Sequence, residues 1–534
     1  MELLKTTLRA DGGVRSAQTR SEDRWTLRLA PEPGQEPVLK EVSARFRFNV
    51  QDADVVWVNG YQSWTHSPER RTDGLDKSLL YCPRFLDRKF GFSQYGDGHF
   101  CKPQYRRGLF KGYSYAYIRR GKTYHFFGSL SEDTGFTRIV INAKEGTVSF
   151  EKDCRGRALS GEWTGLDLYL AKGTEDEVFD GWFAAMGVQA LPAKPAVGYT
   201  SWYNCYQDIS ELQILRDLKG MKTLRPQPEI FQIDDGYERF VGDWLDVDEK
   251  KFPQGLEPIL RQITAAGYRA GIWLAPFLCE KKSALFREHP DWLLRDEAGE
   301  PVYTGGNWSG GYALDVYNDE VRSYVRRSIE HYKDMGFTLF KLDFLYAACM
   351  LPRPDKTRGE IMAEAMDFLR EVCGQAQILG CGVPLASAFG RVEYCRVGPD
   401  ISLDYDDKPY MRLFHAERPS TLQTLHNTVF RRQLDGRAFL NDPDVFILRH
   451  ENNTLTPAQK EALGSLNALF GSVLFASDNF ESYDEAQRKL FAHFCDLQAA
   501  RHVTLLSAAV FGKTTKLRIR YELRGETRLL ECEI

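Results

Sequence analysis

The chain has 534 residues, of which 43% are apolar and 27% charged, and its net charge is −4. This composition is typical of a folded globular protein and excludes both wholesale disorder and collagen-like repeats. The near-balance of charge gives no electrostatic reason to expect nucleic acid or an anionic membrane as a partner. At this length we expect two or three domains.

Targeting signals and cysteine motifs are absent from the sequence. The N-terminal residues MELLKTTLRADGG lack the apolar stretch of a signal peptide, and no run of about 18 apolar residues could span a membrane. The eleven cysteines include no Cys-x-x-Cys pair, so neither a disulfide framework nor a zinc ribbon is indicated. The sequence therefore predicts a cytoplasmic protein with reduced thiols.

Residues 1–190 have the pattern of β-strands. Apolar and polar residues alternate in VSARFRFNV (42–50), YSYAYIRR (113–120), KTYHFFGSL (122–130) and GTVSFEK (146–152). Turn residues separate such stretches, and no long helical pattern occurs before about residue 174. We therefore expect a large antiparallel β-sandwich at the N-terminus.

From the prolines of LPAKPAVGY (191–199) onwards, short buried stretches alternate with amphipathic helical patterns, several of which end in glycine. The predicted strands are AVGYTSWY (196–203), EIFQID (229–234), YRAGIWLAP (268–276), FTLFKLDF (337–344), AQILGCG (376–382), VEYCRVG (392–398), RAFLND (437–442) and SVLFASD (472–478). Eight β-then-α units predict a (β/α)8 barrel over 191–490, and the periodicity alone also allows a doubly wound sheet. Residues 491–534 return to strands in TKLRIRYEL (515–523) and TRLLECEI (527–534), which predicts a small C-terminal β domain.

Polar and mostly acidic residues follow the predicted strands, at the end where a barrel carries its active site. They are Ser201 to Tyr203, Asp234 to Gly236, Trp273, Lys341 to Asp343, Cys381 with Gly382, Arg396 to Asp400, Asn441 to Asp444, and Asp478. Each alone can be explained as a turn or the start of a loop. Their joint placement predicts a site at one rim of the barrel.

The residue types at this rim exclude several chemistries. No HExxH or HxH spacing lies near the strand ends, no Gly-rich phosphate loop follows a strand, and no GxSxG occurs. Metal-dependent hydrolysis, nucleotide binding and serine hydrolysis are therefore disfavoured. Paired carboxylates acting on an uncharged, polyhydroxylated ring remain, and this is the chemistry of glycoside hydrolysis.

Eight ordered motifs resemble the α-galactosidases (melibiases) of glycoside hydrolase family 36, especially their short bacterial forms. The motifs are NGYQSW (59–64), SWYNCY (201–206), FQIDDGYE (231–238), GIWLAPF (271–277) with HPDW (289–292), FKLDFLYA (340–347), ILGCGVPL (378–385), RVGPD (396–400) and LNDPDVFILR (440–449). The resemblance implies an N-terminal antiparallel β-supersandwich (1–190), a central (β/α)8 TIM barrel (191–490) and a small C-terminal β domain (491–534). It also implies a retaining exo-α-galactosidase that acts on melibiose- and raffinose-type α-galactoside oligosaccharides, with no cofactor and no metal.

The resemblance assigns roles to individual residues. Asp343 corresponds to the nucleophile and Asp400 to the general acid/base. The expected sugar-binding residues are Trp64, Trp202, Tyr203, Asp234, Asp235, Trp273, Lys341, Cys381 and Arg396. Asp234 and Asp235 resemble the carboxylates that bind the 4- and 6-hydroxyls of galactose, and Cys381 lies where the family faces the 2-hydroxyl.

Two electrostatic expectations follow for the reacting carboxyls. Lys341 precedes Asp343 by two residues on one strand, so both face the same side, and the ammonium favours the ionised nucleophile. A guanidinium beside Asp400 would oppose the protonated form with which the acid must start. We therefore expect Arg396 to face the sugar or Asp343 instead.

Three other functions are compatible with the same scaffold. An α-N-acetylgalactosaminidase would differ in the space near Cys381, where the longer relatives' CSGGGR segment is Gly380 to Pro384 here. A raffinose-synthase-like α-galactosyl transferase would keep Asp343 and favour a sugar acceptor over water. A non-catalytic carbohydrate-binding protein is disfavoured because both carboxylates are present. The sequence makes no prediction of oligomeric state.

Overall fold

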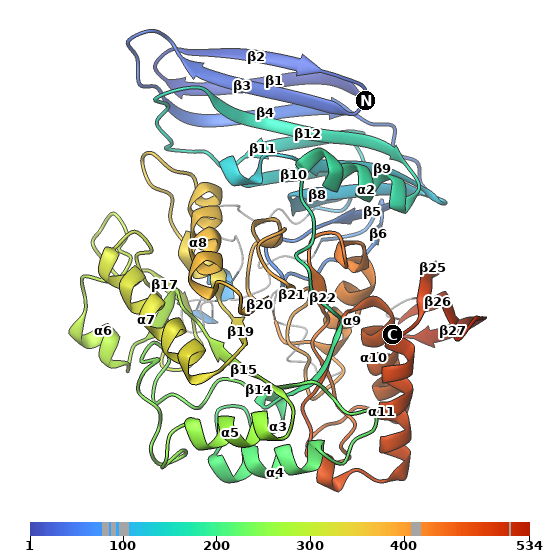
Figure 1. The fold of residues 1–534 in the computed structure, drawn as a ribbon. Coiled ribbons are helices and arrows are strands. Elements are labelled where there is room, and N and C mark those ends of the chain that lie inside the picture. Colours follow the sequence, from blue (N-terminus) through green and yellow to red (C-terminus); the bar gives the residue numbers. More distant parts are fainter. Residues whose placement is uncertain (77–84, 87–91, 96–105, 407–417, 512–513) are drawn as a thin grey trace.

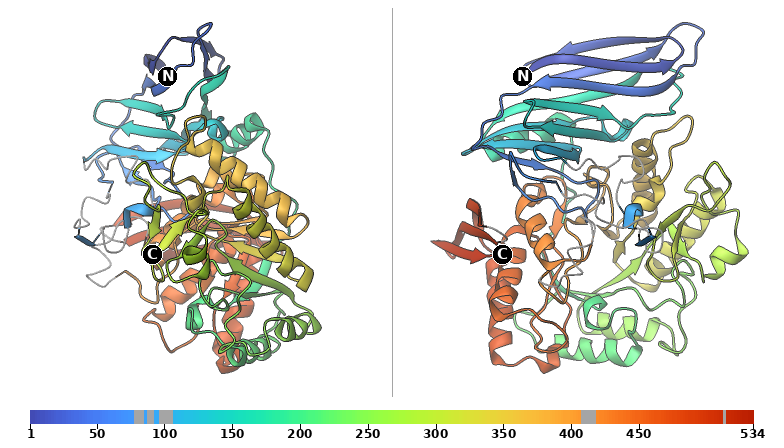
Figure 2. Two further views of the ribbon diagram at one scale, coloured as in Figure 1. Left: turned by 90° about the vertical axis from the view of Figure 1, so that its left-hand side faces the viewer. Right: turned by 180° about the vertical axis from the view of Figure 1, so that it is seen from behind.

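The computed structural model describes residues 1–76, 85–86, 92–95, 106–406, 418–511 and 514–534. Two antiparallel sheets are followed by a parallel sheet surrounded by helices, and a small three-stranded sheet ends the chain. Figure 1 shows the N-terminal strands (blue to teal) stacked on one end of the helix-covered part, and Figure 2 shows the same arrangement from two other sides. The predicted fold class is confirmed.

The N-terminal strands form two sheets that face one another. The five-stranded sheet contains, in spatial order, β1 (Glu2–Asp11), β4 (Val38–Arg47), β11 (Thr147–Lys152), β10 (Thr137–Asn142) and β7 (Leu109–Tyr113). The seven-stranded sheet contains β2 (Val14–Arg20), β3 (Arg24–Pro31), β12 (Trp163–Gly173), β9 (Thr123–Ser129), β8 (Tyr115–Arg120), β5 (Val55–Val58) and β6 (Arg70–Arg71). Buried residues alternate along β4 and β10, as the period-two pattern predicts. Side chains of both sheets, such as Trp25 and Phe46, share one core.

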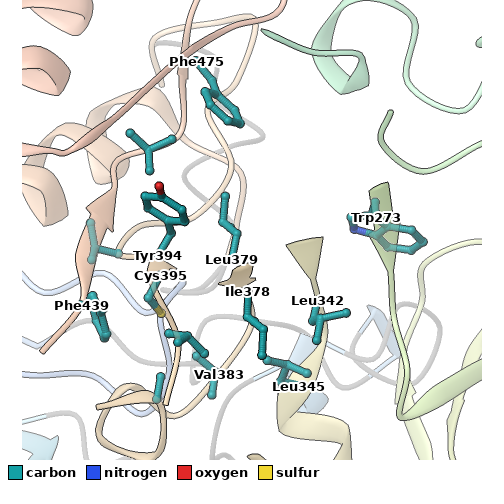
Figure 3. Close-up of a cluster of buried hydrophobic side chains, with 14 of the residues drawn as sticks. Trp273, Leu342, Leu345, Ile378, Leu379, Val383, Tyr394, Cys395, Phe439 and Phe475 are labelled. Atoms are coloured by element: carbon teal, nitrogen blue, oxygen red, sulfur yellow. The ribbon is translucent and has the colours of Figure 1, made fainter. Parts of the chain in front are cut away.

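The parallel sheet closes into a barrel-like ring. Its strands are, in chain order, β13 (Ala196–Thr200), β14 (Ile230–Ile233), β15 (Arg269–Leu274), β19 (Leu339–Leu342), β20 (Gln377–Gly380), β21 (Tyr394–Arg396), β22 (Leu440–Asp442), β23 (Val445–Phe446) and β24 (Val473–Ala476). Each of the eight predicted strands overlaps one of these, and the seventh overlaps β22, whereas β23 lies beyond the predicted range. Figure 3 shows the apolar packing between them, with Leu342, Ile378 and Tyr394 from three neighbouring strands.

The seventh strand is interrupted where the ring closes. Its first half, β22, pairs with β21, and its second half, β23, pairs with β24. Pro443 lies between the halves and has no N–H to donate to a ladder. Asp444, the next residue, has a left-handed φ of 75°. The chain therefore bends here and brings Asp442 and Asp444 to the rim.

Helices cover the outside of the ring. They are α3 (Trp202–Cys205), α4 (Glu211–Met221), α5 (Glu257–Ala265), α6 (Ala284–Glu288), α7 (Asp319–Met335), α8 (Arg358–Cys373), α9 (Thr421–Phe430), α10 (Pro457–Phe470) and α11 (Glu485–Gln498). In α7, Val321, Val325, Ile329 and Tyr332 are buried on one face, as its 3.6-residue period requires. The described helices include none with the length and apolarity needed to cross a membrane.

Smaller elements complete the described chain. A three-stranded sheet beside the rim contains β16 (Leu278–Glu280), β18 (Gly311–Ala313) and β17 (Tyr303–Gly305), and α2 (Glu175–Met186) follows the N-terminal sheets. The C-terminal sheet contains β25 (Arg501–Phe511), β26 (Thr514–Leu523) and β27 (Glu526–Glu533). The sequence predicted the last two strands and missed β25, which lacks a regular alternation and pairs with two register shifts.

The predicted domain boundaries stay a prediction, and α11 extends past the one at residue 490. The nine described cysteines are free thiols, whereas Cys82 and Cys101 lie outside the described residues.

A buried arginine joins the N-terminal part to the barrel. The loop between β5 and β6 carries Trp64, and Ser63 N–H donates to the carbonyl of Val383 (2.9 Å). Arg431, which follows α9 and is fully buried, donates to the carbonyls of Ser63 (2.6 Å) and Val397 (2.8 Å) and to the side chain of Asn59 (3.1 Å). One guanidinium therefore fixes the Trp64 loop over the barrel.

We expect Arg431→Met to lower the free energy of unfolding by about 3 kcal/mol, because several buried acceptors lose their donor. The KM for substrate should rise as well, since Trp64 loses its support. Urea unfolding measures the first effect. Arg528→Met is the matched control: Arg528 pairs with Glu526 at the surface, and its loss should cost under about 1 kcal/mol. Equal effects of the two variants would contradict this account of the loop.

Candidate active site

Predicted site residues from five barrel strands and the N-terminal loop line one cavity of about 260 Å3. They are Trp64, Trp202, Asp234, Asp235, Trp273, Lys341, Asp343 and Asp400. Asp343 and Asp400 thus face a single space, which two groups acting on one sugar require. A wider cavity of about 540 Å3 lies beside α6 and α7 and contains none of the predicted residues.

Asp343 is held rigidly at the end of β19. Trp273 Nε1 donates to its Oδ2 (3.1 Å) and the backbone N–H of Phe344 donates to its Oδ1 (2.7 Å). Burial raises the pKa of Asp343, the positive charge of Lys341 opposes that rise, and the nearby Asp400 adds to it. The carboxylate is therefore oriented by two hydrogen bonds and poorly solvated, a combination that suits a nucleophile.

Lys341 and Asp234 form a buried ion pair in the same cavity. Lys341 Nζ lies 2.9 Å from Asp234 Oδ2, an oxygen that also accepts from Thr200 Oγ1 (2.9 Å) and Gln232 Nε2 (2.8 Å). Burial disfavours the charge of Lys341, but Asp234 and then Asp343 outweigh it and raise its pKa. The predicted influence of Lys341 on Asp343 is therefore present, although its closest partner is Asp234.

Asp235 has a different set of partners. Its carboxylate accepts from Trp308 Nε1 (2.9 Å) and from Gln207 Nε2 (3.1 and 3.3 Å), and it shares a hydrogen bond with the carboxyl of Glu238. Burial raises the pKa of both carboxyls, that of Glu238 well above its ordinary value. The hydrogen bond between them opposes this rise for Asp235 and adds to it for Glu238, so Glu238 binds a proton more readily than Asp235.

The expectation for Arg396 is wrong. Arg396 Nη2 lies 2.7 Å from Asp400 Oδ1 and 2.7 Å from Asp444 Oδ2, and the guanidinium does not line the cavity. Asp400 follows Arg396 by four residues, and the chain between them turns so that the two side chains meet. The sequence spacing alone did not predict this turn. Val397 N–H donates to the carbonyl of Asp442 (3.0 Å), which ties the segment to the seventh strand.

The two other predicted residues outside the cavity lining are Tyr203, which contacts Asp444, and Cys381, which contacts the lining residue Trp64. Tyr203 OH donates to Asp444 Oδ2 (2.5 Å), and Cys381 Sγ lies 3.3 Å from Trp64 Nε1. An added Cβ on Gly382 would lie 2.8 Å from the Trp64 ring, so the indole packs tightly against this segment. The corner next to Cys381 is therefore filled by Trp64.

Seven further residues that line the cavity were not predicted from the sequence. They are Tyr95, Asn307, Trp308, Phe344, Pro399, Arg418 and Pro419. Phe344 and Pro399 are inside motifs already singled out and could have been found from them. Trp308 and Asn307 come from the loop between β17 and β18, for which the only sequence signal was a tryptophan beside glycines.

Comparisons with known proteins agree with this geometry. The family model described as Melibiase matches residues 193–344. An α-galactosidase of Escherichia coli is 35% identical over 178 residues, which are 31% of this chain and 24% of that protein. The α-galactosidase AgaA of Geobacillus stearothermophilus is 29% identical over 138 residues, 24% of this chain and 18% of its own length. The matched segments thus span about a quarter or less of these curated relatives.

Solved structures match over more of the chain. The α-galactosidase TtGalA from Thermus thermophilus, in complex with p-nitrophenyl α-D-galactopyranoside, superposes with a TM-score of 0.75 and 26% identity over 98% of both chains. The family 36 α-galactosidase AgaA from Geobacillus stearothermophilus superposes with a TM-score of 0.62 and 13% identity, over 93% of this chain and 70% of that one. At 13% identity the second match supports the fold alone.

Proposed function

We propose, from the relationship of this chain to the α-galactosidases of glycoside hydrolase family 36, that it is a retaining exo-α-galactosidase. The observation that carries the proposal is the single cavity shared by Asp343 and Asp400. TtGalA has also been solved in complex with stachyose, which supports α-galactoside oligosaccharides as the substrate class. The substrate is a chain that ends in α-linked galactose, of the melibiose or raffinose type.

In the first step, Asp343 attacks the anomeric carbon while Asp400 gives its proton to the glycosidic oxygen. The C1–oxygen bond breaks, a galactosyl ester forms on Asp343, and the leaving sugar departs as an alcohol. The hydrogen bonds from Trp273 and from the backbone of Phe344 fix the attacking carboxylate. This orientation lowers the entropic part of the barrier.

In the second step, water replaces the leaving sugar. Asp400, now a carboxylate, takes a proton from this water as its oxygen attacks C1, and the ester to Asp343 breaks. Two displacements at one carbon retain its configuration. Proton NMR during hydrolysis of melibiose should show α-galactose as the first product, and β-galactose as the first product would refute the mechanism.

Asp234 and Asp235 provide the selectivity for galactose. A charged carboxylate accepting from the axial 4-hydroxyl makes a bond about twice as strong as a neutral one. A glucoside places that hydroxyl equatorially and leaves a buried acceptor unpaired. Lys341 and Trp308 hold the two carboxylates in place before substrate arrives.

The filled corner beside Cys381 favours galactose over N-acetylgalactosamine. Trp64 packs against Cys381 and Gly382, where the resemblance expects the 2-position of the sugar. We expect p-nitrophenyl α-N-acetylgalactosaminide to be cleaved at least about 100-fold more slowly than the α-galactoside, since an acetamido group would displace the indole. Comparing kcat/KM for the two substrates is the test. In Trp64→Ala the ratio should fall, and an unchanged ratio would show that Trp64 does not set it.

A galactosyl transferase would share the first step and use a sugar in place of water in the second. Product analysis at low acceptor concentration separates the two activities. Free galactose as the main product supports a hydrolase, whereas galactosylated acceptor as the main product would favour the transferase.

The acid limb of the pH profile should lie above the ordinary range for aspartate. Burial raises the pKa of Asp343 above its usual value of 3.8, and the attacking group must be ionised. Activity is therefore lost as pH falls through this raised value. In Lys341→Met the limb should move to higher pH, because the charge that favours the carboxylate is gone. The measurement is kcat/KM against pH, and a limb unchanged in this variant would contradict the assignment.

A further inference from the structure

Asp444 is a buried carboxyl that the two-step mechanism does not use. It lies directly after the break in the seventh strand, is 3% exposed, and keeps a left-handed φ of 75°. Strain of this kind in a non-glycine residue persists only where the surroundings enforce it, and it concentrates at functional sites. The Asp444 carbonyl accepts from Asn467 Nδ2 (3.1 Å) and its N–H donates to Asp442 Oδ1 (2.9 Å), so the backbone is fixed from two sides.

One oxygen of Asp444 collects three donors. Arg396 Nη2 lies 2.7 Å from Oδ2, Tyr203 OH donates to it (2.5 Å), and the backbone N–H of Ile401 donates to it (2.8 Å). Ile401 is the residue after Asp400, so Asp444 also anchors the backbone that carries the acid/base.

Arg396 serves both carboxyls with the same nitrogen. Its Nη2 is 2.7 Å from Asp400 Oδ1 as well, while its Nε is buried and has no hydrogen-bond partner among the described residues. The guanidinium is 1% exposed, so no solvent screens it. A single positive charge therefore lies between two carboxyls, and it can compensate only one of them when both are ionised.

This arrangement resolves a conflict in the mechanism. If Arg396 paired with Asp400 alone, it would favour the ionised form and remove the proton that the first step needs. Asp444 competes for the same charge and has two further donors, Tyr203 OH and the backbone N–H of Ile401. When Asp444 carries the negative charge, the guanidinium is already compensated, and the ionisation of Asp400 is disfavoured.

We propose, on the basis of the proposed function, that Asp444 is a positioning residue that takes the charge of Arg396 and so lets Asp400 keep its proton in the free enzyme. After Asp400 has given up this proton to the leaving oxygen, its carboxylate shares the guanidinium until water returns a proton in the second step. The two carboxyls of Asp400 and Asp444 thus hold one proton between them before each turnover.

Among the described residues, Asp444 interacts with Arg396, Asp400, Asp442 and Tyr203. Burial raises its pKa to about 7, whereas the charge of Arg396 and the hydrogen bond from Tyr203 oppose this rise. The charge of Asp400 also reaches Asp343 and Tyr206.

The test is Asp444→Asn, studied in the full chain. The amide can still accept from Tyr203 and Ile401 but carries no charge, so Arg396 pairs with Asp400 alone. We expect the basic limb of kcat/KM against pH for melibiose to move to lower pH by about one unit. A 2,4-dinitrophenyl α-galactoside needs no general acid for its leaving group. At pH values above the basic limb, the ratio of its kcat/KM to that of melibiose should therefore be at least about tenfold higher in the variant than in the wild type. This ratio is independent of how much of the preparation is folded.

Two further variants make the experiment decisive. Asp435→Asn neutralises a half-buried carboxyl beside the seventh strand, one that accepts from Asn441 N–H (2.7 Å) and Ser472 Oγ (3.0 Å). It should shift neither the limb nor the ratio. Tyr203→Phe removes one donor to Asp444 and should shift both in the same direction as Asp444→Asn, but less.

The outcomes separate the two proposals. A wild-type protein that cleaves no α-galactoside would refute the proposed function. An active wild type, with limbs and ratios unchanged in both Asp444→Asn and Tyr203→Phe, would overturn this inference alone.

Discussion

Asp343→Asn is expected to lower kcat/KM for p-nitrophenyl α-galactoside by about 10⁵-fold, because an amide cannot form the galactosyl ester. The fold should not suffer. Burial raises the pKa of Asp343 in the folded state, so keeping it ionised costs stability at neutral pH, and Asn removes this cost. The unfolding temperature of the variant should therefore equal or exceed that of the wild type.

A slow fluorinated galactoside provides the complementary measurement. It should add one sugar mass to the peptide that carries Asp343 in the wild type and leave the variant unlabelled. Label on a peptide that carries Asp400 instead would reverse the two roles, and substantial turnover by Asp343→Asn would rule out this mechanism.

Asp235→Asn should have the second largest effect, a loss of about 10³-fold in kcat/KM for α-galactosides. The charged acceptor for the sugar hydroxyl becomes neutral, and the side chains of Trp308 and Gln207 lose the charged carboxylate to which they donate. Activity on an α-glucoside, already weak, should change by less than about tenfold. The preference for galactose would then largely disappear, which parallel assays of the two p-nitrophenyl glycosides measure.

Asp243→Asn is the control for this experiment. Asp243 is also a buried carboxyl, but it accepts from the backbone N–H groups of Ala284 (2.7 Å) and Leu285 (3.0 Å) at the start of α6 and lies outside the cavity. Asp243→Asn should leave the preference for the α-galactoside over the α-glucoside unchanged. If Asp235→Asn lowers both glycoside activities equally, Asp235 supports the fold of the site without selecting the sugar.

Much of the scaffold can be read from local patterns. Period-two alternation identified strands such as β4 and β11, and buried runs followed by helical patterns identified the barrel strands. The acidic residues of the site could be located in the same way, because the C-terminal ends of barrel strands meet at one rim. Asp234, Asp343 and Asp400 therefore share a cavity as expected.

The sequence by itself determined which residues form strands and which strand ends carry carboxyls, since periodicity and turn chemistry act over a few neighbouring residues. Only the tertiary structure decided how distant side chains pair. Arg431 fixes a loop some 370 residues away, Trp308 reaches Asp235 from another loop, and Arg396 joins Asp400 to Asp444 at the end of the neighbouring strand of the ring. Such pairs depend on which chain segments the closed barrel brings together, and no local sequence pattern encodes which distant segments become neighbours.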